Sequence, residues 1–217
     1  VVETRDFSGD GLSDGETAHG NAVAEIVHET APGANLTLVR STSLPEFMSA
    51  TEWIAENPGI DVAVMSVSYV GVDRSPDAAI TEAIRNDDDT VWVGSAGNYG
   101  GGKHWFDSQA PSERGDLVAF DEDTACNIVR GSDPARVVVE WDSWEGNADY
   151  DLGLYRYSRA TDELTYVGGS TRDQTAGAAP YESVEIPARS PNTDYCITIS
   201  NWAADGFHTL HAWSLGP

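Results

Sequence analysis

A histidine at the start of a helical pattern is the first residue of this sequence whose setting suggests chemistry. From His19 to Val27, apolar residues recur three and four positions apart, which predicts a helix that begins at the histidine. The positive end of a helix dipole favours the neutral imidazole that a general base must have. A lone histidine at such a place is more often a surface residue, so its interpretation depends on the segments around it.

Polar residues also follow two short apolar segments that are typical of buried parallel strands. Ser66-Val67-Ser68 ends the first of them, and Gly94-Ser95-Ala96-Gly97-Asn98 follows the second. An asparagine amide can donate a hydrogen bond to an oxyanion without adding a titrating charge, although Gly-Asn turns are also common without a function. Because ligands of parallel sheets bind at the carboxyl ends of the strands, we expect both loops near one site.

Three of these segments together resemble the subtilisin-like serine peptidase family. His19-Gly20-Asn21 with the later Ala31-Pro32-Gly33-Ala34 is similar to the family's histidine segment, and Ser95-Ala96-Gly97-Asn98 to its oxyanion turn. The strand before Ser68 resembles a wall of the family's substrate pocket. Asn21 and Ser68 depart from the family's usual Thr and Gly, and the second change alters the shape of that pocket.

The resemblance implies a role for each matching residue. It implies that His19 is the general base and that Asn98 is the oxyanion donor. It also implies that a peptide or protein substrate lies in a groove lined by Ser66, Val67, Ser68, Gly94, Ser95 and Ala96. No cofactor is required for such catalysis.

Two residues that this chemistry needs are not found in the expected segments. No Gly-Thr-Ser occurs, and Ser170 lies among turn residues without a following helix. Asp6, Asp10 and Asp14 are predicted to lie in an acidic, glycine-rich loop rather than at the end of a strand. We therefore expect the nucleophilic serine and the triad aspartate in a missing remainder of the peptidase domain, and the chain alone to be inactive.

Two other functions stay open at this point. The first is a pseudo-peptidase that has lost its serine and binds a peptide or partner protein. The second is a binding module for peptide, protein or carbohydrate in the second half of the chain, which is rich in tryptophan. Trp141, Trp144, Trp202 and Trp213 are the candidates for stacking on sugars, although aromatic residues of a sandwich are more often core.

The fold prediction is a chain of two parts. Residues 1–102 alternate helices and strands, which predicts part of a subtilisin-like doubly wound parallel sheet. Residues 103–217 carry short strand patterns between turns, which predicts an antiparallel β-sandwich or jelly roll. The boundary falls somewhere within 103–130. The second part loosely resembles a pre-peptidase C-terminal module, inserted between the oxyanion asparagine and the serine.

Six further residues bear on cofactors and compartment. Asp142, Asp149 and Asp151 are weak candidates for a structural calcium ion, the alternative being a solvated acidic edge. Cys126 and Cys196 lack the spacing of a zinc site, and either a single disulfide or two buried thiols fits them. The sole lysine, Lys103, illustrates how few basic residues the chain has.

The charge of the chain excludes several partners. It carries 36 acidic and 12 basic residues, a net charge of −24. Such a chain repels nucleic acids and anionic membranes, so neither is an expected partner. No apolar run is long enough to span a bilayer. The acidic, lysine-poor composition favours a secreted, extracellular protein adapted to strong salt, the alternative being an ordinary acidic secreted protein.

Overall fold

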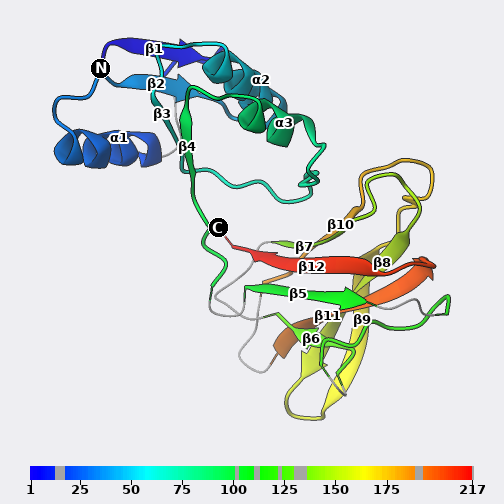
Figure 1. The fold of residues 1–217 in the computed structure, drawn as a ribbon. Helices are drawn as coiled ribbons and strands as arrows, with labels where there is room; N and C mark the ends of the chain where they lie inside the picture. Colours follow the sequence, from blue (N-terminus) through cyan, green and yellow to red (C-terminus); the bar gives the residue numbers. More distant parts are fainter. Residues whose placement is uncertain are drawn as a thin grey trace. The chain divides into compact units, whose positions relative to one another are not determined.

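The computed structural model describes residues 1–12, 18–100, 103–109, 113–121, 124–129, 136–188 and 193–216. The fold is mixed α/β, and most of its sheet pairing is antiparallel. Internal contacts divide the chain into two units (Figure 1). The first comprises Val1–Tyr69 and Arg74–Gly97, and the second comprises Val70–Asp73 and Asn98–Pro217.

The first unit alternates strands and helices. Its elements are β1 (Glu3–Asp6), α1 (His19–Thr30), β2 (Thr37–Arg40), α2 (Leu44–Ala55), β3 (Val62–Met65), α3 (Ala79–Arg85) and β4 (Val91–Gly94). The β3–β4 pair is parallel, as expected, and β2 pairs in parallel with β1, a strand that the sequence does not predict. They form two separate two-stranded sheets, so the described residues do not join them into the continuous sheet that the sequence predicts.

Local sequence signals explain where α2 begins. The Ser43 hydroxyl accepts the Glu46 N–H, and the Glu46 carboxylate accepts the Ser43 N–H at 3.2 Å. This reciprocal pair is the capping box that the sequence predicts, and Pro45 occupies the first turn, where a missing N–H costs nothing. The helix therefore starts where its sequence specifies, and it packs against α3.

The second unit contains two four-stranded antiparallel sheets. Its strands are β5 (His104–Gln109), β6 (Asn127–Ile128), β7 (Arg136–Trp141), β8 (Asp149–Ser158), β9 (Glu163–Ser170), β10 (Tyr181–Glu185), β11 (Thr193–Ala203) and β12 (His208–Leu215). One sheet has the order β10-β7-β12-β5 and the other has the order β6-β11-β8-β9. The two sheets form separate layers (Figure 1), an arrangement compatible with a β-sandwich.

The main core of the chain lies between these two sheets. Alternate residues of the inner strands supply it, including Val139 of β7, Leu152 of β8 and Ile199 of β11. Trp141 is 2% exposed, packs edge-on against Tyr150 at 5.3 Å between ring centroids, and donates its indole N–H to the Ala148 carbonyl. It is thus a core residue and has no free face for a sugar.

Two long-range contacts connect flanking segments to the inner strands β7 and β11 of the second unit. Cys126 and Cys196 form a disulfide that ties the segment before β6 to β11, which confirms one of the two alternatives for these residues. The Gly71 N–H donates to the Glu140 carboxylate at 2.6 Å, across 69 residues. Gly71 has φ 70°, a left-handed conformation that favours glycine. None of the described helices is both long and apolar enough to span a membrane.

Candidate functional site

The first helix presents His19 to the loop that follows β3. His19 is the first residue of α1, so its side chain leaves the helix at the amino-terminal turn. Its Nε2 lies 2.9 Å from the backbone carbonyl oxygen of Ser66 and 3.2 Å from the Ser66 hydroxyl. Two segments 47 residues apart are thereby joined at the carboxyl end of β3.

The loop after β4 lies beside the loop after β3. The Ser95 N–H donates to the Met65 carbonyl at 3.0 Å, and the Ser95 hydroxyl donates to the Val67 carbonyl at 3.3 Å. These bonds extend the parallel pairing of the two strands by one step beyond the Met65–Gly94 pair. The predicted groove residues of both loops therefore lie next to each other, and Val67, Ser68 and Gly94–Ala96 are exposed.

The predicted oxyanion donor, Asn98, belongs to the second unit. It is exposed, and it follows Gly97, whose φ of 80° places the backbone in a left-handed turn. A side chain at position 97 would be strained in that conformation. The contacts above thus bring together His19, Ser66, Val67 and Ser95 within the first unit, and Asn98 is not part of that set.

The prediction that Asp6 lies in a loop is wrong. Residues Glu3–Asp6 form β1, which pairs in parallel with β2 and has Asp6 as its last residue. The Asp6 carboxylate accepts the Ser8 N–H at 2.9 Å, the Ser8 hydroxyl at 2.6 Å and the Gly11 N–H at 2.7 Å. These hydrogen bonds, with that from the Ser8 hydroxyl first, hold the pKa of Asp6 below its ordinary value. Asp10 is exposed and lies 3.9 Å from Arg40, and Asp14 lies outside the described residues.

The three calcium candidates have different surroundings. The Asp142 carboxylate accepts hydrogen bonds from His208 Nδ1 at 3.0 Å and from the Thr209 N–H at 3.1 Å, so both of its oxygens already bind groups of the protein. Asp149 is 1% exposed, and burial, followed by repulsion from Asp151 and Asp173, raises its pKa to about 6. Over the described ranges, no three His, Cys, Asp or Glu side chains gather in a way that could hold a metal ion. Calcium binding at these residues stays a prediction.

Comparison with known proteins adds little to this geometry. The sequence matches no protein-family model and no curated protein. Among solved structures, it is similar to the Avr2 effector protein of the fungal plant pathogen Fusarium oxysporum, with 17% identity and a TM-score of 0.23 over 46% of this chain and 90% of that chain. It is also similar to AlgX of Pseudomonas aeruginosa, with 8% identity and a TM-score of 0.27 over 82% of this chain and 51% of that chain. At these TM-scores neither similarity supports a statement about fold or function.

Proposed function

We propose that the chain is part of an exported subtilisin-like serine endopeptidase, in which His19 is the general base. The observation that carries this proposal is the contact of His19 Nε2 with Ser66 at the carboxyl end of β3. A surface histidine that merely began a helix would have no reason to meet the loop that the resemblance assigns to the substrate groove. The side-by-side loops after β3 and β4 support the same groove.

Asp6 is the proposed partner of His19, in place of an aspartate outside the chain. It ends β1, whose parallel partner β2 follows α1 in the chain, so it lies at the carboxyl edge of that strand pair. A carboxylate has about four acceptor positions, and three are used by Ser8 and Gly11. Within the part of the chain that the structure describes, one acceptor position is left for an imidazole N–H, which would fix the histidine tautomer during catalysis.

The proposed reaction uses His19 and Asn98 of this chain together with a serine from outside it. A serine hydroxyl downstream of Pro217 attacks the peptide carbonyl carbon while His19 takes the hydroxyl proton. Asn98 donates a hydrogen bond to the oxyanion that forms, and His19 returns the proton to the leaving amine. A water molecule then attacks the acyl carbon while His19 takes its proton. His19 returns that proton to the serine oxygen as the carboxylic acid product leaves.

The test is peptide hydrolysis by the protein encoded by the complete gene. His19→Ala should abolish turnover, and Asn98→Ala should lower kcat by ~10²–10³ at nearly unchanged KM. Asp6→Asn should lower kcat on the order of 10⁴-fold, whereas Asp10→Asn, a matched change in the loop that follows β1, should have little effect. Full activity of the His19→Ala protein would refute the proposal.

The disulfide supports an oxidising compartment for this protein. Cys126 and Cys196 are bridged, and such bridges form and persist mainly in secreted and extracellular proteins. Together with the acidic surface, this supports secretion into a saline medium. The substrate in this proposal is a peptide or protein, and the catalytic step requires no cofactor.

A further inference from the structure

A β-bulge near the end of β11 turns one tryptophan toward solvent. Asn201 pairs with Tyr150 and Ala203 pairs with Asp149, so Trp202 is the extra residue between them. The flanking Asn201 is 2% exposed, whereas Trp202 is 45% exposed. Bulges commonly re-aim a side chain in this way next to a functional site. Trp202 therefore differs from Trp141, which the same unit buries in its core.

The segment before β6 holds an arginine against this tryptophan. Gly115 and Asp116 exchange backbone hydrogen bonds with Asn201 at 2.6 and 2.9 Å, and the Val118 N–H donates to Ile199 at 2.8 Å. These hydrogen bonds hold residues 115–118 beside β11. The Arg114 guanidinium carbon lies 3.6 Å from the centroid of the Trp202 ring, so the guanidinium covers one face of the indole, and the stacked pair makes an amphipathic platform.

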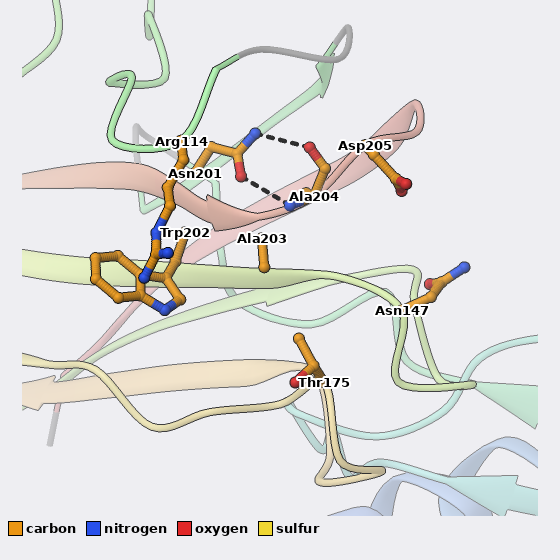
Figure 2. A pocket seen from close by; sticks show the side chains of 8 residues that line it. All are labelled: Arg114, Asn147, Thr175, Asn201, Trp202, Ala203, Ala204 and Asp205. Atoms are coloured by element: carbon orange, nitrogen blue, oxygen red, sulfur yellow. Dashed lines mark hydrogen bonds between the residues drawn. The ribbon is translucent and has the colours of Figure 1, made fainter.

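The platform forms one side of a pocket of about 390 Å³ at one end of the second unit. Figure 2 shows Arg114 against Trp202 at one side, with Asn147 on the opposite side and Thr175 below them. The pocket is lined by Arg114, Asn147, Thr175 and the residues from Asn201 to Asp205. Its volume falls within the range of small-molecule sites, ~300–1,000 Å³.

Each loop around the pocket is fixed by its own hydrogen bonds. The Asn201 side chain bonds both the N–H and the carbonyl of Ala204 at 2.8 Å (Figure 2). Asn147 is bonded to the Ser143 hydroxyl through its backbone N–H and its side chain. Thr175 bonds to Asp173 through its hydroxyl at 2.6 Å. A pocket that is rigid before binding loses less entropy when a ligand enters.

We propose that this pocket binds a neutral sugar ring of a polysaccharide or glycoprotein. A sugar has an apolar C–H face, which suits the indole, and a rim of hydroxyls, which suits the amide of Asn147 and the carboxylate of Asp205. The apolar part of the lining is only Trp202, Ala203 and Ala204, too little for a large apolar ligand. The positive charge of Arg114 is offset by Asp205, which also lines the pocket, and by Asp151, which lies within electrostatic reach of Arg114. The site therefore does not favour anionic sugars. This site lies outside the proposed catalytic residues and does not depend on the peptidase proposal.

The test titrates the 217-residue chain with maltotriose, cellotriose and tri-N-acetylchitotriose, followed by calorimetry and by the indole N–H resonance of Trp202. At least one neutral trisaccharide should bind and shift that resonance, and trigalacturonate should not bind. Trp202→Ala should weaken the binding at least about tenfold. Phe207→Ala is the matched control, because Phe207 is 75% exposed in the loop that follows β11 and does not line the pocket.

Four outcomes would overturn the proposal. These are the binding of none of the neutral trisaccharides, binding that Trp202→Ala leaves unchanged, equal weakening by Phe207→Ala, and preference for trigalacturonate. Far-UV circular dichroism of each variant verifies that the sandwich is folded. Both aromatic side chains are substantially exposed, so neither substitution removes core packing.

Discussion

His19 Nε2 lies 2.9 Å from the backbone carbonyl oxygen of Ser66. A carbonyl can only accept a hydrogen bond, so this geometry requires the proton on Nε2. A general base that acts through Nε2 needs that nitrogen unprotonated, with the proton on Nδ1 and held there by a carboxylate. In the proposed peptidase, the proton would therefore have to move from Nε2 to Nδ1 when the site is completed.

We expect ¹⁵N NMR of the 217-residue chain to show His19 in the Nε2–H tautomer at neutral to basic pH. The contact involves the backbone of Ser66, so Ser66→Ala should leave the tautomer unchanged, while His19→Gln identifies the resonance. An Nδ1–H tautomer in the wild-type chain would show that the carbonyl contact does not form in solution.

Replacing Asp149 with asparagine should stabilise the second unit at neutral pH. Its pKa is raised from 3.8 to about 6, so the folded state binds the proton more tightly than the unfolded state. The stability from this group is complete below pH 3.8 and is lost as the pH rises through about 6. Removing the charge should therefore increase the free energy of unfolding by ~2–3 kcal/mol at pH 8 and by little at pH 4.

Urea unfolding at the two pH values measures this difference. Asp142→Asn is the control, because Asp142 is exposed and accepts hydrogen bonds from His208 and Thr209. It should give no comparable gain at pH 8. If Asp149→Asn were neutral or destabilising at pH 8, the buried carboxylate would have a compensating partner, such as the calcium ion predicted for this region.

Removal of the Cys126–Cys196 bridge should destabilise the sandwich. The bridge closes a loop of 70 residues, for which loop-closure entropy gives ~4 kcal/mol of stabilisation. The double variant Cys126→Ser/Cys196→Ser should unfold at lower urea concentration than the oxidised wild type. A reducing agent should shift the wild type to the same midpoint and leave the variant unchanged. Equal midpoints with and without the bridge would refute this expectation.

The fold should depend on salt concentration. A net charge of −24 on 217 residues produces repulsion that molar salt screens within a few ångströms, ~3 Å at 1 M. Far-UV circular dichroism should show loss of structure as salt falls from molar to millimolar concentrations. Complete structure at low salt would contradict adaptation to strong salt.

Local signals in the sequence predict a strand well where it is buried in the core, and a helix well where a capping residue begins it. The capping box of Ser43 and Glu46 marks the start of α2, and the short apolar, valine-rich run at 136–141 marks β7, because these signals act within a few residues. Glu3–Asp6 has charged side chains and is largely exposed in a two-stranded sheet, so no buried face marks β1 in its sequence.

The candidate site was predictable in its residues but not in all of its contacts. The histidine segment and the strand end at Ser66 could be identified separately, whereas the bond between them depends on chain packing across 47 residues. The grouping of Val70–Asp73 with the second unit depends on Glu140, which lies 69 residues from Gly71. Trp202 is exposed because of a β-bulge, and no local pattern in the sequence predicts that bulge.

The most direct test of the peptidase proposal is the coding sequence that follows the codon of Pro217. We expect a Gly-Thr-Ser at the start of a helical pattern, after strands that extend the two small parallel sheets of the first unit. Such a segment would supply the nucleophile for which His19 is the base. A stop codon directly after Pro217 would contradict the account, because the chain would then lack any serine in the expected setting.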